Sequence, residues 1–131
     1  MGGPLSRGIL DTSVLIATDI APIPGELAVS VASLAELQFG VLIAKDQQAR
    51  ALRLSRLSAI QRRFDALPID DAVADSYAQL AARVVELGRQ PRGRVMDLLI
   101  AATAHAHDAT VYTRNAEDLA GLDDLVTIKS V

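Results

Sequence analysis

Short, mostly apolar runs that alternate with longer helical stretches are the feature that most constrains the fold of this chain. Residues 7–10 form one such run, which stops at Asp11 and is typical of a buried parallel strand. Similar runs at 28–31, 110–113 and 125–128 predict three further strands. Because helical stretches separate these strands, we expect an α/β sandwich with a central parallel β-sheet flanked by helices.

The segments between the strands carry apolar residues at helical spacing. Residues 19–27 are the exception: they contain two prolines and a glycine and predict a loop or lid. The predicted helices span residues 32–44, 47–67, 71–87 and about 95–107, with shorter helical turns at 13–17 and near 116–120.

The length of 131 residues fits one compact domain, so we expect a single domain over residues 1–131. Cysteine is absent, which excludes disulfide scaffolds, thiolate zinc sites and cysteine nucleophiles. No apolar run approaches the roughly 20 residues that a membrane-spanning helix needs. The N-terminus lacks the apolar core of a secretory signal, and we therefore expect a cytoplasmic protein.

The net charge of −3 argues at first against a nucleic-acid enzyme, because proteins that bind nucleic acids are commonly basic. The charge is unevenly distributed, however. Residues 45–94 hold ten basic and six acidic side chains, whereas the remainder holds three basic and ten acidic ones. A mildly basic middle thus lies between two acidic ends.

Polar residues follow the predicted strands at the edge of the sheet where α/β proteins form their sites. Four segments that are distant in sequence bring acids toward this edge. The polar residues in question are Asp11, Thr12 and Ser13 after the first strand, Glu36 in the helix after the second, Asp97 at the start of a later helix, and Asn115 and Asp118 after the strand at 110–113.

Each of these residues also has a purely structural interpretation. Asp11 can cap the next helix, and Ser33 with Glu36 matches the S-x-x-E capping box. Asp97 near a helix start is favoured by the helix macrodipole, and the polar residues at 115–118 suit a turn. These local roles leave unexplained why all four segments meet at one edge.

Several carboxylates brought together repel one another and raise each other's pKa unless a cation compensates. Oxygen ligands without cysteine or clustered histidine favour Mg²⁺ or Mn²⁺. Acids that hold such an ion activate water and stabilise a phosphoryl transition state. The acids therefore predict phosphodiester hydrolysis.

Three segments, ILDTSVLIA, SVASLAELQFG and DLLIAATAHAHDATVYTRNAEDL, resemble the PIN domain, specifically the VapC toxins of bacterial toxin–antitoxin pairs. The resemblance covers residues 8–120. It implies an α/β fold with a central parallel sheet, and a Mg²⁺- or Mn²⁺-dependent endoribonuclease acting on structured RNA such as tRNA or rRNA. It also implies inhibition by a VapB-type antitoxin, which inserts a C-terminal segment at the active site.

Carried over to this chain, the resemblance assigns three metal-binding or catalytic acids and their supporting residues. Asp11 corresponds to the first metal ligand, Glu36 to the second acid and Asp97 to the third. Thr12 and Ser13 support the first of them.

The fourth acid of the pattern belongs in the TRNAED segment, where this chain departs from the pattern. Asn115 stands directly after Thr113 and Arg114, in place of an aspartate. Asn115 can offer a neutral oxygen to a metal or its water, while Asp118 can supply the missing charge from the next turn. The sequence leaves both open, and a weakened second metal site would follow; Thr113 is counted among the supporting residues.

A carboxylate site needs cationic surroundings before an RNA backbone approaches it. The candidates for phosphate contacts are Arg89, Arg92, Arg94 and Arg114, although solvated surface arginines are the alternative for each. With only two Phe, two Tyr and no Trp, recognition is expected to rely on RNA shape more than on base stacking.

Other enzyme classes fit the sequence less well. A haloacid dehalogenase-type phosphatase needs an acid where Ser13 stands, and a receiver domain needs an acidic pair that is missing here. The sequence contains no G-x-S-x-G elbow, and His105 with His107 does not form an H-E-x-x-H zinc site.

A catalytically weakened PIN fold that only binds RNA or an antitoxin remains the alternative to an enzyme. The apolar faces of 32–44 and of the following helix are also more extensive than one small sheet can cover. We therefore expect a homodimer and a groove for a partner helix.

Overall fold

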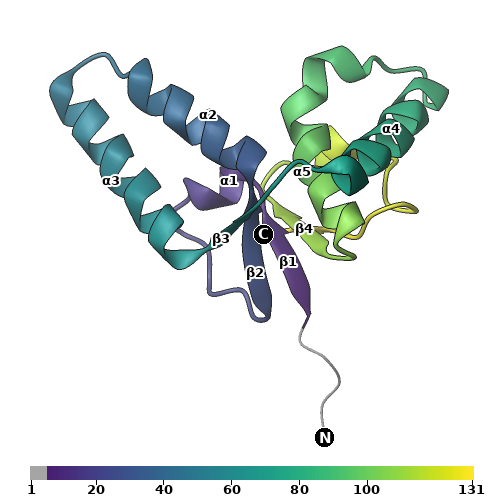
Figure 1. Cartoon of the computed structure of the whole chain (residues 1–131), viewed down its shortest axis with the longest axis horizontal. Helices are drawn as coiled ribbons and strands as arrows, with labels where there is room; N and C mark the ends of the chain where they lie inside the picture. The colour runs from purple at the N-terminus through teal and green to yellow at the C-terminus, as the bar shows by residue number, and fades with distance from the viewer. Residues whose placement is uncertain (1–5) are drawn as a thin grey trace, which may run out of the picture.

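A computed structural model describes residues 6–131, and Figure 1 shows its elements in chain order. The expectation about a secretory signal rests partly on residues 1–5, which lie outside the described residues. The elements are β1 (Arg7–Leu10), α1 (Thr12–Leu15), β2 (Glu26–Ser30), α2 (Val31–Leu42), α3 (Gln47–Arg63), β3 (Asp65–Leu67), α4 (Asp71–Glu86), the 3₁₀ helix η1 (Pro91–Arg94), α5 (Val95–Ala106), β4 (Thr110–Thr113), the 3₁₀ helix η2 (Ala116–Leu119) and β5 (Ile128–Ser130).

The strands form one five-stranded sheet in the order β3-β2-β1-β4-β5, and every pairing is parallel. The predicted α/β architecture with a central parallel sheet is therefore confirmed. Strand β1 lies in the middle, so its carboxyl end at Asp11 faces the centre of the sheet edge. This is the edge at which parallel sheets form their sites.

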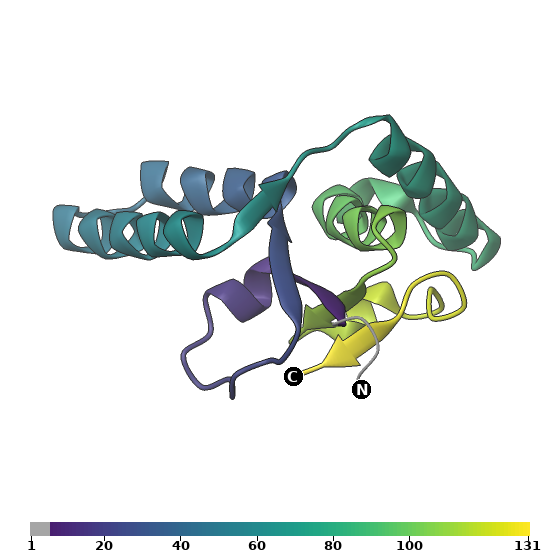
Figure 2. The same ribbon diagram turned by 60° about the horizontal axis from the view of Figure 1, so that its bottom comes forward.

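Alternate side chains of the central strands enter two different cores, because successive residues of a strand point to opposite faces. Ile9 and Val111 belong to the larger core, which α4 and α5 cover. Leu10 and Tyr112 belong to a smaller core with Val14 of α1. Figure 2 shows α4 and α5 above the strands and α1, with the loop that follows it, on the other side. Both faces of the sheet are thus covered, as the continuous apolar runs predicted.

Two strand predictions were wrong in position and one strand was missed. The helix expected to run to Leu67 ends at Arg63, and residues 65–67 form β3, because their backbone pairs with β2 at the edge of the sheet. The last strand begins at Ile128, since Leu125 and Val126 instead donate backbone bonds to Leu122 in a turn. The second strand begins at Glu26, and Val31 already starts α2. Local patterns did not contain these backbone pairings.

The helical hairpin of α2 and α3 leans away from the α4–α5 pair (Figure 1). Arg50 and Arg53 of α3 donate hydrogen bonds to the carbonyl oxygens of Leu42 and Gly40, near the end of α2. These bonds occupy carbonyls that a helix end leaves without partners. In the described part of the chain, no helix is long and apolar enough to cross a membrane.

Candidate active site

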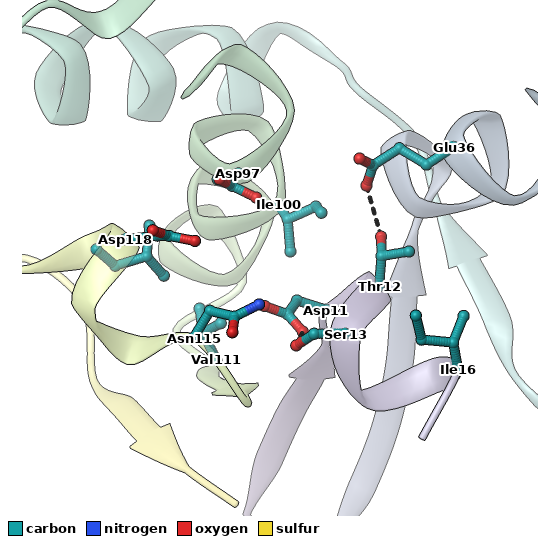
Figure 3. A pocket seen from close by; sticks show the side chains of 11 residues that line it. Asp11, Thr12, Ser13, Ile16, Glu36, Asp97, Ile100, Val111, Asn115 and Asp118 are labelled. Carbon is teal, nitrogen blue, oxygen red and sulfur yellow. Dashed lines mark hydrogen bonds between the residues drawn. The ribbon is translucent and has the colours of Figure 1, made fainter. Parts of the chain in front are cut away.

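All of the predicted acids line one pocket at the carboxyl edge of the sheet, with a volume of about 230 Å³. Figure 3 shows side chains from β1 and α1, α2, α5 and η2 turned toward this space. Its lining consists of Asp11, Thr12, Ser13, Ile16, Glu36, Asp97, Ile100, Val111, Asn115, Asp118 and Leu119. The folded chain thus brings together residues that lie up to about a hundred positions apart in sequence.

Asp11 both caps a helix and faces the pocket. Its Oδ1 accepts a hydrogen bond from the backbone N–H of Val14 at 3.3 Å, as an N-cap does. The same oxygen accepts from the Ser13 hydroxyl at 2.5 Å, and Ser13 Oγ in turn accepts from the backbone N–H of Arg114 at 3.0 Å. Asp11 therefore caps α1 as expected, and the same hydrogen bonds hold its carboxylate in place at the pocket.

Ser13 also approaches Thr113, the predicted supporting residue at the end of β4. The two hydroxyl oxygens are 3.5 Å apart, and Thr113 is completely buried. Thr113 Oγ1 accepts from the backbone N–H of Asn115 at 2.9 Å. Thr113 therefore lies beneath the site, joining the ends of β1 and β4, and does not line the pocket.

Glu36 reaches the site through Thr12. The Thr12 hydroxyl donates to Glu36 Oε1 at 2.6 Å and lies 3.2 Å from Ser33 Oγ (Figure 3). The capping-box interpretation of Ser33 and Glu36 is wrong, because the N-cap of α2 is Ser30 and the helix already begins at Val31. Ser33 is instead a buried residue of the first turn of α2. Glu36 does not cap the helix, and its side chain lines the pocket.

Asp97 lies in the first turn of α5, as expected. Partial burial raises the pKa of the Asp97 carboxyl above its ordinary value, and the negative charges of Asp118, Glu36 and Asp11 raise it further. Arg94 acts in the opposite direction and lowers this pKa. The carboxylates of Asp118, Glu36 and Asp11 are thus close enough to Asp97 to disfavour its charged form.

The two candidates for the fourth acid occupy different parts of the pocket. Asn115 is the N-cap residue of η2, but its side chain makes no capping bond and points toward Asp11 in Figure 3. Asp118 lies on the η2 turn across from Asp97 (Figure 3). Of the neighbouring carboxylates, Asp118 has the largest effect on the pKa of Asp97. Asp118 therefore supplies the negative charge next to Asp97, and Asn115 supplies a neutral amide next to Asp11.

Three of the four predicted phosphate-binding arginines make contacts within the protein. Arg114 forms a 2.6 Å ion pair with Asp19, which lowers the pKa of the Asp19 carboxyl, and Arg89 donates to the carbonyl of Ala120 at 3.2 Å. Arg94 contacts Asp118. Arg92 is exposed, and no acidic partner pairs with it among the described residues.

The pocket residues that the sequence analysis missed are apolar. Ile16, Ile100, Val111 and Leu119 form the wall between the polar groups. Ile100 follows Asp97 by three positions and so shares its helix face, which is a signal that the sequence did contain. The Asp19–Arg114 pair had no comparable signal, because it joins a loop to the end of a distant strand.

The donor set fits a hard divalent cation in chemistry. It consists of half-buried carboxylates with hydroxyl and amide oxygens, without any sulfur. The mutual repulsion around Asp97 is the kind that a cation relieves. Within residues 6–131, no three acidic or histidine side chains converge closely enough to form a complete metal-binding group by themselves.

The chain is similar to known proteins along most of its length. A family model described as the PIN domain matches residues 9–124. Ribonuclease VapC5 of Mycobacterium tuberculosis is 40% identical over 132 residues, which cover 96% of this chain and 95% of that protein.

Solved structures resemble the whole fold. The crystal structure of VapBC-5, a member of the VapBC family of toxin–antitoxin systems from Mycobacterium tuberculosis, contains a chain with a TM-score of 0.83 and 39% identity, with coverage of 96% of this chain and 98% of that one. FitAcB from Neisseria gonorrhoeae has a TM-score of 0.74 and 28% identity, over 92% of this chain and 95% of that chain.

Proposed function

The chain belongs to the PIN-domain family, and from this membership we propose that it is an endoribonuclease, the toxin of a toxin–antitoxin pair. The observation that carries the proposal is the pocket in which Asp11, Glu36, Asp97 and Asp118 meet from four separate segments. The relatives supply the reaction class, because VapC5 is named a ribonuclease. The proposed reaction is hydrolysis of phosphodiester bonds in structured RNA such as tRNA or rRNA.

We propose that Asp11, Glu36 and Asp97 hold a divalent cation, Mg²⁺ or Mn²⁺. When bound, such an ion lowers the pKa of a water molecule and stabilises negative charge on the phosphate. The protein's own part is to hold the acids: Ser13 and Val14 fix Asp11, Thr12 fixes Glu36, and the first turn of α5 fixes Asp97. The raised pKa of Asp97, which lies near three other carboxylates in the same pocket, supports this assignment, because a cation would relieve that repulsion.

For the fourth position we propose Asp118, with Asn115 as a neutral supporting group. Asp118 has the largest effect of any carboxylate on Asp97. Asp118→Asn is then expected to reduce RNA cleavage by at least tenfold, whereas Asn115→Ala is expected to reduce it by less than about threefold. A larger loss in Asn115→Ala than in Asp118→Asn would assign the fourth position to Asn115.

The RNA backbone is proposed to approach over Arg92 and Arg114, which are exposed or near the surface. Arg114 reaches a phosphate only by leaving Asp19, and a solvent-exposed ion pair of this kind is weak enough to be exchanged. Low aromatic content supports recognition of RNA shape over base stacking.

The partner is proposed to be a VapB-type antitoxin, because VapBC-5 is a toxin–antitoxin system and its fold covers nearly this whole chain. A second pocket of about 320 Å³, lined mainly by apolar side chains of α1, the following loop and α3, offers space for a partner segment. Apolar side chains also remain exposed on α2 and α3, which supports association with a second copy.

Cleavage of total RNA with mapped 5′ ends, with and without Mn²⁺, tests the enzyme directly. We expect cleavage at discrete sites that requires the metal and is reduced more than roughly 100-fold in Asp97→Asn, because a lost ligand costs several kcal/mol of transition-state stabilisation. Full activity in excess EDTA, or in Asp97→Asn, contradicts the proposal.

The second candidate is a PIN fold that binds RNA or an antitoxin without cleaving it. The neutral Asn115 and the incomplete convergence of the acids favour this candidate. It predicts that wild-type protein binds RNA and leaves it intact at every Mn²⁺ concentration. The same RNA mapping therefore separates the two candidates.

A further inference from the structure

Arg94 contacts Asp118, one of the pocket acids, at two of its atoms. Its Nη1 donates to the backbone carbonyl oxygen of Asp118 at 2.5 Å and lies 3.6 Å from Asp118 Oδ1. Both side chains are partly shielded, with 33% of Arg94 and 45% of Asp118 exposed. Three residues after Arg94, Asp97 lies in the first turn of α5. Arg94 thus links the start of α5 to η2.

The placement of Arg94 conflicts with the local preference of a helix. It is the N-cap residue of α5, where the helix macrodipole disfavours a positive charge, and its side chain makes no capping bond. A residue that breaks a local rule without a local gain is expected to serve a site. Here the gain is the contact with η2, the turn that carries Asp118.

We propose that Arg94 is a positioning residue of the active site, which holds Asp118 and its turn in place beside Asp97 and does not bind RNA. The inference rests on the proposed metal-dependent function. It revises the phosphate-binding role expected from the sequence, because the guanidinium that would meet RNA is already engaged by Asp118. Bonds of this kind to a ligand-bearing segment tune metal affinity.

Arg92 provides a matched control on the same 3₁₀ turn. It is an arginine two residues away that is exposed and pairs with no acid among the described residues. A change at Arg92 therefore removes the same charge from the same turn but leaves Asp118 in place. Any general effect of lost charge appears in both variants.

The first experiment measures Mn²⁺ affinity of the whole protein by isothermal titration calorimetry, without RNA. Arg94→Met is expected to weaken Mn²⁺ binding by roughly tenfold and Arg94→Lys by about threefold, because lysine keeps the charge without the planar fork. Arg92→Met is expected to stay within about twofold of wild type. Equal Mn²⁺ affinity in Arg94→Met and wild type overturns the inference.

A double-mutant cycle tests whether the effect passes through Asp118. In an Asp118→Asn background, Arg94→Met is expected to weaken Mn²⁺ binding by less than twofold further, because the carboxylate that it positions is already gone. A full additional tenfold loss overturns the inference. Should Arg94→Met fail to fold, the Mn²⁺ affinities of Arg94→Lys and Arg92→Lys are compared in its place, and only Arg94→Lys is expected to bind Mn²⁺ more weakly than wild type.

RNA cleavage kinetics separate positioning from substrate binding. Arg94→Met is expected to lower kcat while KM for RNA stays within twofold of wild type. A raised KM with unchanged kcat and unchanged Mn²⁺ affinity identifies a phosphate contact and overturns the inference. If wild-type protein neither binds Mn²⁺ nor cleaves RNA, the proposed function is wrong and the inference about Arg94 is wrong with it. If wild-type protein does both but the Arg94 variants behave like wild type, only the inference about Arg94 is wrong.

Discussion

At the scale of single residues, the pocket joins structural and functional roles in the same side chains. Asp11 caps α1 and also faces the pocket, and Thr12 starts that helix while it holds Glu36. Local capping explains each position separately but not their convergence. Partial burial of a carboxylate beside like charges is costly to the fold, and the raised pKa of Asp97 reflects that cost, burial first and the neighbouring charges second.

Asp97→Asn is expected to stabilise the metal-free protein at pH 7. The raised pKa means that folding disfavours the charged carboxylate, so a neutral amide of similar shape removes the repulsion. We expect the melting temperature in EDTA to rise by only about 2 °C, because solvent screens the repulsion at a half-buried carboxylate. Differential scanning calorimetry measures the shift.

The control is Asp123→Asn, a change of an exposed aspartate in the loop before β5 that forms no ion pair in the described part of the chain. This variant is expected to melt within about 1 °C of wild type. A fall in melting temperature for Asp97→Asn would mean that the carboxylate stabilises the metal-free fold.

At the scale of elements, the central strand and the helix starts determine where the acids lie. Strand β1 pairs with both β2 and β4. Helix α2 begins directly after β2, and Ser30, the last residue of β2, is its N-cap. Ser30 Oγ lies 3.2 Å from Thr103 Oγ1 of α5, and both residues are completely buried. The helices that carry Glu36 and Asp97 are therefore joined by a polar contact in the core.

Gly8 and Gly40 provide a paired test of these elements. A Cβ on Gly8 would lie 2.5 Å from Tyr112 Cε2 and 2.9 Å from Leu27 Cδ2, so Gly8→Ala is expected to cost about 1–3 kcal/mol by forcing β1 away from its neighbours. A Cβ on Gly40 in α2 meets nothing within 4 Å among the described residues. Gly40→Ala is expected to gain about 0.5–1 kcal/mol from helix propensity.

Urea denaturation of the two variants measures the free energies of unfolding. Opposite signs for the two glycines are expected, and the slope with denaturant is expected to remain that of wild type. Destabilisation by Gly40→Ala would show that another molecule or chain approaches α2 closely at this position.

At the scale of the whole molecule, exposed apolar side chains on one part of the surface favour association with a second copy of the chain. Phe39 and Leu42 near the end of α2 are 62% and 63% exposed, and Leu52 of α3 is 64% exposed. These residues lie on the hairpin that leans away from the rest of the molecule (Figure 1). The expected homodimer would cover this surface, consistent with the extensive apolar faces in the sequence.

The double variant Leu42→Glu and Leu52→Glu is expected to convert the dimer to a monomer of 13.9 kDa in light scattering, because two charges would be buried in the interface. Val85→Glu on α4 is the control, since Val85 is similarly exposed at 59% on a different helix. A dimer that survives in the double variant would place the interface elsewhere.

The proposed divalent cation would offset acids in the pocket, so the net charge of −3 would understate the attraction of the metal-loaded protein for RNA. Mn²⁺ at 100 times its dissociation constant is expected to stabilise wild-type protein by about 2.7 kcal/mol, and Asp97→Asn by much less. Thermal unfolding with Mn²⁺ and then EDTA measures this. An equal rise in both proteins would place the bound metal away from Asp97.

The sequence by itself determined the fold class and the polar residues that meet in the pocket. Apolar runs that end in Asp11 or enter the helix of Glu36 are local patterns, and a parallel sheet sends all such ends to one edge. The resemblance of the motifs added the reaction class. Local patterns were weakest at sheet edges: β3 and β5 are held by backbone pairing with a neighbouring strand, which short apolar runs do not encode.

Only the tertiary structure decided which contacts each polar residue makes, and therefore which role it has in the pocket. Helix α2 begins at Val31, so Glu36 has no capping-box role. Asp118 lies near Asp97 and affects its pKa. Arg94 pairs with Asp118, and Arg114 pairs with Asp19. The physical reason is the range of the interactions. Helix and strand formation depend on near neighbours, whereas a charge responds to every group within a few ångströms, whatever its distance along the chain.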